Sequence, residues 1–242
     1  MKLDCYLVPS EVTEATLSER VVVIVDVLRA CTTMTHALFN GAEKILPAAS
    51  IEAATKLTSS LDKGSTLLCG ERDGKMVKGF DLGNSPLEYT REVVENKTLV
   101  FATTNGTKLM AKGLKAREQL VCAFINVGRV VAQLKPEGAE SAVVCAGRTG
   151  YFSLEDTVCA GMVVSKVCEA FPGAWELNDG AIAARALYEK FGGDILGMLR
   201  NSSHGRYLAS LGFEQDIEVC SRVDSVPVLP VAREGRVTLH NG

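Results

Sequence analysis

The chain has 242 residues, of which 47% are hydrophobic and 23% are charged, and its formal charge is -3. These values are typical of a soluble globular protein with one large domain or two small ones, and they exclude a disordered chain. No apolar run approaches the roughly 18 residues that a membrane helix needs, and the segment around Asp4 lacks the core of a signal peptide. We therefore expect a cytoplasmic protein without a membrane partner, and the small negative charge argues against a nucleic-acid partner.

The cysteines and histidines limit the chemistry further. Eight cysteines are scattered among apolar neighbours without a Cys-x-x-Cys pair, which excludes zinc-ribbon and thioredoxin-like sites and indicates buried, reduced thiols. The chain has only three histidines, His36, His204 and His240, and of these only His204 is a candidate for anion binding or proton transfer. Because a histidine-rich metal site is excluded, carboxylates are the expected metal ligands, and these favour Mg²⁺.

Predicted strands and helices alternate from the first strong signal onwards. Val21–Val25 is a run of β-branched residues, typical of a strand that is buried on both faces. Ala30–Phe39 is a predicted helix that ends at Asn40 and Gly41. The next expected elements are a strand at 44–46, a helix from Ser50 to Leu61 and a strand at 66–69.

A long polar loop follows, from Gly70 to Asn84. Loops beyond about 12 residues inside a compact domain are often functional. Ser85, Pro86 and Glu88 then form a capping-box pattern, which predicts the start of a helix directly after the loop.

The middle of the chain repeats the alternation. Predicted strands at 99–101, 120–124 and 142–145 are each followed by a predicted helix, the last of them from Leu154 to Ala170. This alternation predicts an α/β fold with three α/β/α layers and a mixed, largely parallel central sheet.

The last third of the chain has a different pattern. It reads as helices at 179–191 and 203–211, a strand at 217–220 and short strands within 227–239. Since no linker separates the two parts, we expect a single compact domain over residues 1–242, with two lobes, 1–150 and 151–242, as the alternative.

Two strand-to-helix turns are candidate anion sites, at 30–33 and 103–107. Ligands bind beyond the carboxyl ends of strands in open α/β sheets, and hydroxyls and backbone N–H groups at such turns bind anions. The alternative, that these are ordinary turn and capping residues, is weaker for two turns than for one. The predicted substrate-binding residues are Arg29, Thr32, Thr33, Asn84, Thr103, Thr104, Asn105, Gly106, Arg148 and His204.

Carboxylates gather at the same strand ends. Asp26 ends a buried strand, where a charge adds nothing to packing. We expect Asp26, Glu71 and Asp81 to be catalytic, and Asp26, Asp81, Glu155 and Asp156 to hold Mg²⁺ against a phosphate. Glu155 and Asp156 have a structural alternative, because acids in the first turn of a helix complement its dipole.

The chain lacks the common phosphate-handling motifs. It has no Gly-x-x-x-x-Gly-Lys-Ser/Thr loop, no Gly-x-Gly-x-x-Gly fingerprint and no Gly-x-Ser-x-Gly elbow. The segment after Asp26 also lacks the second aspartate of the haloacid-dehalogenase-type phosphatases. A phosphate-handling enzyme with this sequence therefore needs a less common scaffold.

Several segments with these candidate residues match one family, in that family's order. The strings Gly-Phe-Asp-Leu-Gly-Asn-Ser-Pro at 79–86 and Thr-Thr-Asn-Gly-Thr at 103–107 are long enough to be specific. With 25–33, 69–72, 146–161 and 202–205, they resemble the 2-phosphosulfolactate phosphatases over nearly the whole chain. Cys31 and Asp73 depart from the pattern, since the family usually has threonine at the first position and glycine at the second.

The resemblance implies Mg²⁺-dependent hydrolysis of 2-phospho-3-sulfolactate to 3-sulfolactate and phosphate, a step towards coenzyme M. The expected partner is thus a small anionic phospho-acid substrate, and a homodimer is the base-rate expectation for the assembly. Whether water attacks directly or Asp26 first forms an acyl phosphate stays open. The alternatives are a sugar-phosphate or phospho-acid lyase or isomerase, and an anion-binding module without turnover.

Overall fold

The structure is a computed structural model, and it describes residues 1–103 and 105–240. The strands of this part of the chain form one mixed sheet of eleven, in the order β5-β4-β6-β3-β11-β10-β7-β2-β8-β1-β9. Their bounds are β1 Lys2–Tyr6, β2 Val21–Val25, β3 Lys44–Ala48, β4 Thr66–Arg72, β5 Lys75–Met76, β6 Thr98–Ala102, β7 Glu118–Cys122, β8 Ser141–Cys145, β9 Glu176–Leu177, β10 Pro230–Arg233 and β11 Arg236–Leu239.

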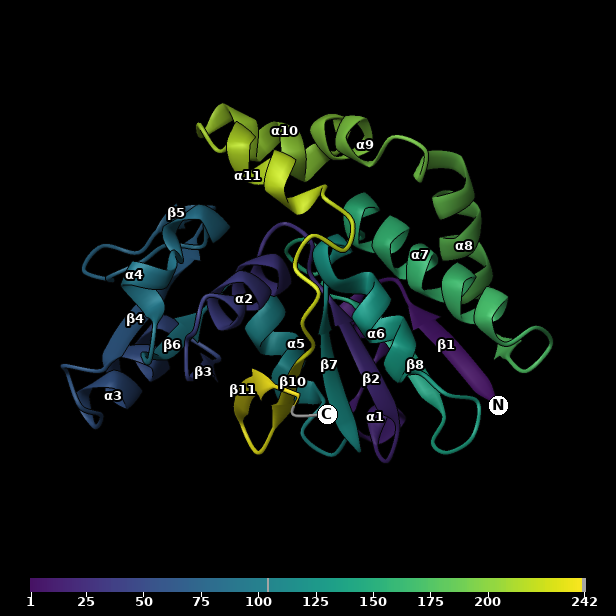
Figure 1. Ribbon diagram of the computed structural model, residues 1–242, viewed down its shortest axis with the longest axis horizontal. Coiled ribbons are helices and arrows are strands. Elements are labelled where there is room, and N and C mark those ends of the chain that lie inside the picture. Colours follow the sequence, from purple (N-terminus) through teal and green to yellow (C-terminus); the bar gives the residue numbers. More distant parts are fainter. Residues whose placement is uncertain (104, 241–242) are drawn as a thin grey trace.

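The helices follow the strands on both faces of this sheet (Figure 1). Their bounds are α1 Glu14–Leu17, α2 Ala30–Phe39, α3 Ile51–Ser59, α4 Arg91–Val94, α5 Gly106–Lys112, α6 Val127–Gln133, α7 Leu154–Ala170, α8 Asp179–Phe191, α9 Ile195–Asn201, α10 Ser203–Ser210 and α11 Glu214–Cys220. Single 3-10 turns lie at Pro9–Glu11, Pro86–Glu88 and Phe124–Asn126.

The sheet consists of two parallel blocks joined by an antiparallel hairpin. Strands β4, β6 and β3 form one block, and β7, β2, β8, β1 and β9 form the other. Between them, the β10–β11 hairpin pairs antiparallel with β7 on one side and with β3 on the other. The sheet is therefore mixed and largely parallel, as the alternation of strands and helices predicted.

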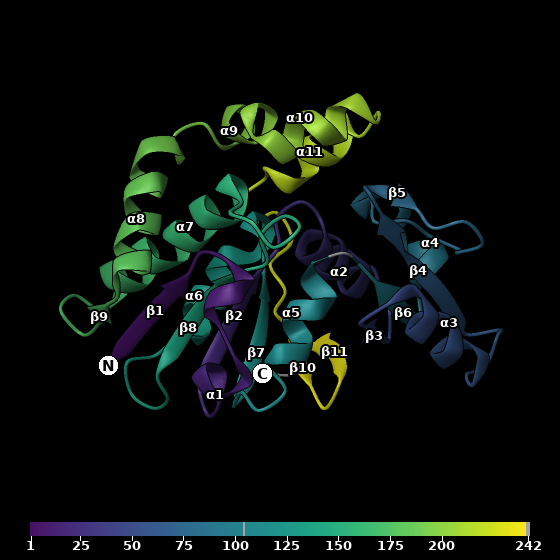
Figure 2. The same cartoon turned by 180° about the vertical axis from the view of Figure 1, so that it is seen from behind.

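The side chains of β2 show why the fold has three layers. Val23 and Val25 pack into one apolar core with residues of α6, α7 and α8, whereas Val22 and Ile24 pack into a second core with residues of α2 and α5. Because successive side chains of a strand point to opposite faces, a continuous apolar strand needs a helical layer on each face. Both figures show helices in front of and behind the strands, which confirms the α/β/α prediction (Figure 2).

Helices α9, α10 and α11 form a separate layer above the ends of the central strands (Figure 1). The prediction of a strand at 217–220 is wrong, because this segment is the end of helix α11. Its isoleucine and valine favour a strand locally, but Asp216, Ile217, Val219 and Cys220 are buried together. That spacing places one helical face against the core, so packing overrides the local preference.

The long polar loop is also more ordered than expected. It contains the end of β4 and the short strand β5, which pair as a hairpin. The helix predicted at Ser85 is only a 3-10 turn, and the Ser85 side chain does not cap it. The Ser85 hydroxyl instead donates to the buried Asp216 carboxylate at 2.6 Å, and the Glu88 carboxylate accepts from the N–H of Gly83. Both capping groups therefore serve contacts outside the turn.

The cysteines are free thiols, as predicted from their spacing, and among those described only Cys168 is not fully buried. No helix in the described ranges is long and apolar enough to cross a membrane.

Candidate active site

A cleft opens where the ends of β2, β4, β6 and β8 meet helix α10. Asp26 follows β2, Glu71 lies in β4, Thr103 follows β6 and Arg148 follows β8, while His204 comes from α10. We call the strand-end residues, together with the first turn of α7, the floor of the cleft, and the helices α10 and α11 its roof. The lining residues are Asp26, Leu28, Arg29, Glu71, Asp73, Gly74, Asn84, Thr103, Asn105, Arg148, Thr149, His204, Tyr207 and Leu208.

Asp26 is the buried carboxylate of the floor, with an exposed fraction of 6%. Its Oδ1 accepts the N–H of Ala30 at 3.1 Å, at the start of α2. A Cβ added to Gly106 would lie only 2.8 Å from Oδ2, so the glycine lets α5 begin directly beside this carboxylate. Burial raises the pKa of Asp26 to about 6, with smaller contributions from the negative charges of Glu71 and Glu155.

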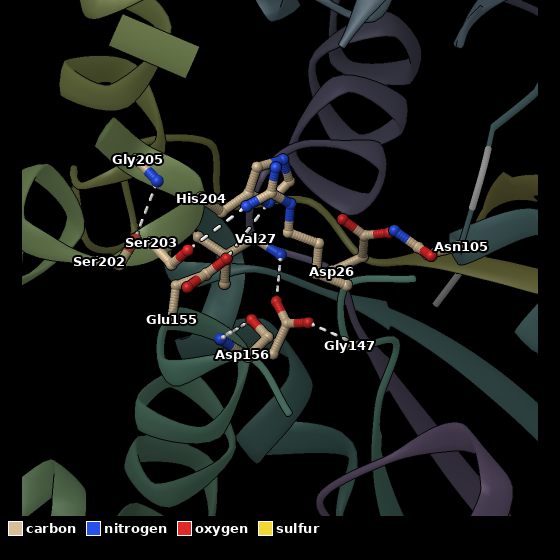
Figure 3. Close-up of polar contacts among 12 residues, drawn as sticks. Asp26, Val27, Asn105, Gly147, Glu155, Asp156, Ser202, Ser203, His204 and Gly205 are labelled. Carbon is tan, nitrogen blue, oxygen red and sulfur yellow. Dashed lines mark hydrogen bonds and ion pairs between the residues drawn. The ribbon is translucent and has the colours of Figure 1, made fainter. Parts of the chain in front are cut away.

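Asp156 lies beneath Asp26 and holds two strand ends together (Figure 3). Its two carboxylate oxygens accept the N–H groups of Val27 and Gly147 at 2.9 and 3.0 Å. The Ser153 hydroxyl accepts the N–H of Asp156 and caps α7, as its place before the helix suggested. Burial raises the pKa of Asp156. Both oxygens of this carboxylate are therefore engaged by the turns that follow β2 and β8.

Glu155 and His204 join the floor to the roof (Figure 3). Glu155 Oε1 lies 3.3 Å from His204 Nδ1, and the two side chains are 3% and 16% exposed. Burial alone would raise the pKa of Glu155, but the hydrogen bond and the attraction of His204 hold it below its usual value. The first turn of α10 is capped by Ser202, whose hydroxyl accepts the N–H of Gly205 at 2.9 Å. This cap fixes the backbone that carries His204.

Arg29 borders the cleft, but its charge is already paired. Its Nη1 donates to Asp216 Oδ2 at 2.6 Å, and its Nη2 donates to the carbonyl oxygen of Gly74 at 2.6 Å. The guanidinium also lies over the ring of Phe213, 4.3 Å from its centre. Both side chains of the Arg29–Asp216 pair are 2% exposed. The arrangement is that of a structural ion pair that joins α11 to the β4–β5 hairpin.

Arg148 is the more accessible arginine of the cleft. Its guanidinium carbon lies 4.5 Å from the centre of the Tyr207 ring, and Nη1 donates to the Ser203 hydroxyl at 3.4 Å. The neighbouring N–H of Thr149 donates to Asn105 Oδ1 at 3.1 Å. This network fixes the loop after β8 against both the roof and the turn after β6.

The predicted hydroxyl ligands mostly stabilise the backbone. Thr32 and Thr33 donate to the carbonyl oxygens of Val27 and Asn84, and neither threonine lines the cleft. Thr103 lines the cleft and accepts the N–H of Thr107 at 3.3 Å. The prediction for Thr104 falls outside the described residues.

The acidic residues of the long loop separate into two groups. Glu71 lines the cleft, and its Oε2 accepts the N–H of Gly74 at 2.8 Å. Asp81 is exposed, does not line the cleft, and accepts the N–H of Leu68 at 2.8 Å. The structure therefore brings Glu71 to Asp26 and places Asp81 at the edge of β4.

The cleft offers few but suitable ligands for Mg²⁺. Among residues 1–103 and 105–240, no group of three His, Cys, Asp or Glu side chains is placed to hold a metal ion. Asn84 lines the cleft, however, and its Oδ1 is buried without a hydrogen-bond partner. Mg²⁺ takes hard oxygen ligands and commonly keeps waters and substrate oxygens beside one or two protein carboxylates. Asp26 and Asn84 fit such a site.

Of the residues above the strand ends, sequence reasoning found His204 but missed three others. Tyr207 lines the cleft, and Arg29 is supported by Asp216 of α11 and by Phe213, which directly precedes that helix. No sequence motif marks Asp216, which is one of three acidic residues in α11, with Glu214 and Glu218. A buried carboxylate at that position does imply a distant basic partner.

The chain matches a family model described as 2-phosphosulpholactate phosphatase over residues 6–235. Three similar proteins are each named probable 2-phosphosulfolactate phosphatase. The Caldanaerobacter subterraneus subsp. tengcongensis protein is 35% identical, and the match covers 98% of this chain and 98% of that protein. The Thermotoga petrophila protein is 41% identical, covering 89% of this chain and 90% of its own. The Clostridium beijerinckii protein is 32% identical, and the match covers 98% of this chain and 99% of that protein. The matched family thus spans the strand ends, the cleft and its roof, and the chain belongs to the 2-phosphosulfolactate phosphatase family.

Proposed function

We propose that this protein is a Mg²⁺-dependent phosphomonoesterase that hydrolyses 2-phospho-3-sulfolactate to 3-sulfolactate and phosphate. The observation that carries the proposal is the buried Asp26 carboxylate at a strand-end cleft that also holds Arg148 and the Glu155–His204 pair. Family membership supplies the substrate, because the similar proteins are named for it.

The charges around the cleft support a requirement for a cation. Asp26, Glu71 and Asp73 line it, and the charge of Arg29 is paired with Asp216. Arg148 is then the principal permanent positive charge that the described lining residues offer to a ligand. A substrate with phosphate, carboxylate and sulfonate groups needs more positive charge than one guanidinium supplies.

Asp26 and Asn84 would hold the ion, which when bound offsets the charge that builds up on the phosphoryl oxygens. Arg148 would form a forked contact with an anionic group, and Thr103 and Asn105 would add hydrogen bonds from the adjacent turn. His204, oriented by Glu155, would donate a hydrogen bond to the substrate. Asp26 either accepts a proton from the attacking water or attacks the phosphorus to form an acyl phosphate.

The test is phosphate release from 2-phosphosulfolactate by the wild type and by Asp26→Asn, each with Mg²⁺ and with EDTA. We expect activity only for the wild type with Mg²⁺, and a loss of at least about 1,000-fold in kcat for Asp26→Asn. Full phosphate release in EDTA would exclude a metal requirement. Unchanged phosphate release by Asp26→Asn would exclude Asp26 from catalysis. Trapping with hydroxylamine separates the two routes, because only an acyl phosphate reacts to give a hydroxamate.

The same assay separates the alternative functions. A lyase or isomerase would consume the substrate without releasing phosphate, and a binding module would show thermal stabilisation by the ligand without turnover. The density of carboxylates around Asp26 speaks against a pure anion binder, because such groups oppose anion binding. We further propose that the reaction serves coenzyme M synthesis, so that loss of the gene would lower the coenzyme M content of the cell.

A further inference from the structure

One roof residue, Tyr207, contacts both sides of the cleft. Its hydroxyl donates to the carbonyl oxygen of Asp73 at 2.9 Å, in the turn between β4 and β5. Its ring lies under the guanidinium of Arg148, 4.5 Å away, at the end of β8. The ring and the hydroxyl therefore reach two segments that are far apart in the sequence and lie on opposite sides of Asp26.

The contact with the hairpin affects an acidic residue of the cleft. The next carbonyl oxygen, that of Gly74, accepts from Arg29 at 2.6 Å, so two successive carbonyl oxygens of the turn are held. A Cβ on Gly74 would lie 2.9 Å from a methyl group of Leu211, which shows how closely the turn packs against the end of α10. The N–H of Gly74 in turn donates to Glu71 Oε2 at 2.8 Å. Holding this turn therefore holds the Glu71 carboxylate at the cleft.

The contact with Arg148 acts on the opposite side. Arg148 belongs to a loop whose next residues, Thr149 and Gly150, are exposed. Its guanidinium contacts the Tyr207 ring and the Ser203 hydroxyl, both in α10. A guanidinium stacked on an aromatic ring keeps its N–H groups free at the edge for an anion.

We propose that Tyr207 is a positioning residue for the hydrolysis, its ring setting Arg148 for the anionic substrate and its hydroxyl holding the Asp73–Gly74 turn that carries Glu71. The role in turnover rests on the proposed function, whereas the role in holding the turn does not. Tyr207 neither attacks the substrate nor transfers a proton.

The hydroxyl is tested by Tyr207→Phe, which keeps the ring. Arg72 and Lys75 are exposed and flank the turn, so trypsin cleavage there reports how often the turn opens. We expect cleavage about two- to tenfold faster in Tyr207→Phe than in the wild type, as for loss of one hydrogen bond. Tyr188→Phe, which alters a half-buried tyrosine of α8, is the matched control and should leave cleavage unchanged. Equal cleavage of Tyr207→Phe and the wild type would overturn this half of the proposal.

The ring is tested by a double-mutant cycle between Tyr207→Leu and Arg148→Ala, read in KM and kcat for 2-phosphosulfolactate. In the protein that retains Arg148, we expect the KM of Tyr207→Leu to be about three- to tenfold higher than the KM of Tyr207→Phe. In Arg148→Ala the two Tyr207 variants should give the same KM. If the Tyr207→Leu and Arg148→Ala effects on KM simply multiply in the double variant, the proposed role of the ring is wrong. A wild type that releases no phosphate would instead refute the proposed function, and the trypsin comparison would still test the turn.

Discussion

The floor and the roof of the cleft hold their charged groups in different ways. On the floor, Asp26 and Asp156 accept backbone N–H groups of the turns around them, at distances of 2.9 to 3.1 Å. Where the roof meets the floor, the charges are instead held by side chains from distant segments, as in the pairs Arg29–Asp216 and Glu155–His204. The ends of strands from both parallel blocks thus build the floor, whereas the roof depends on α10 and α11 docking over it.

Because of this difference, mutations at the floor and in the pairs with the roof should change stability in opposite directions. Removing a floor carboxylate leaves backbone N–H groups that water can satisfy near the cleft, and it relieves the cost of a buried charge. Removing one partner of a roof pair leaves the other charge buried without compensation. The predictions below test whether stability resides at the roof and chemistry at the floor.

The largest expected change in stability is that of Arg29→Ala. Because Asp216 would remain buried without its partner, we expect the free energy of unfolding to fall by about 3–5 kcal/mol in urea titrations. The matched control is Arg91→Ala, which removes an exposed pair with Glu95 and should cost no more than about 0.5 kcal/mol. Similar losses for the two variants would show that the Arg29 pair does not hold the roof.

Asp26→Asn should raise the stability while abolishing activity. The folded-state pKa of Asp26, about 6, lies above its ordinary value of 3.8, so the folded protein binds this proton more tightly than the unfolded chain does. The resulting stability is fully present below the ordinary pKa and is lost as the pH rises through 6. At pH 7.5 in EDTA we expect Asp26→Asn to be more stable by up to about 3 kcal/mol.

The gain should shrink towards zero at about pH 3.5, where the wild-type carboxyl is protonated in the folded protein and mostly protonated in the unfolded chain. Glu137→Gln, which alters an exposed carboxylate far from the cleft, serves as the control and should show no such pH dependence. A gain of the same size at both pH values would contradict the assignment of this effect to ionisation of Asp26.

The smallest of these effects concerns the pair that joins floor and roof. His204→Asn should lower kcat/KM for 2-phosphosulfolactate about 10- to 100-fold, the value of one charge-assisted hydrogen bond to the substrate. Glu155→Gln should lower it less, because the imidazole is retained but poorly oriented. His240→Asn, remote from the cleft, should leave kcat/KM unchanged. Equal kcat/KM values for His204→Asn and the wild type would exclude His204 from substrate binding.

Much of the fold and of the floor could be predicted from local patterns. The β-branched run Val21–Val25 marked the central strand, and its position before Asp26 pointed to the strand-end site. The segment 217–220 was predicted wrongly, because its valine and isoleucine favour a strand while its burial follows a helix. Ser85 failed as a cap for a related reason, since Asp216 offers its hydroxyl a buried charged partner.

The α/β architecture, the buried thiols, the carboxylate at the end of β2 and the family resemblance could all be inferred from the amino-acid sequence. Each depends on residue type, periodicity or a motif within one short segment. Which charges face the cleft depends on how distant segments pack together. The tertiary structure pairs Arg29 with Asp216, places Asp81 at the edge of β4, and brings Tyr207 over both Arg148 and the β4–β5 turn. Whether a charged side chain binds a ligand or a neighbour depends on partners that can lie more than a hundred residues away, as Arg29 and Asp216 do.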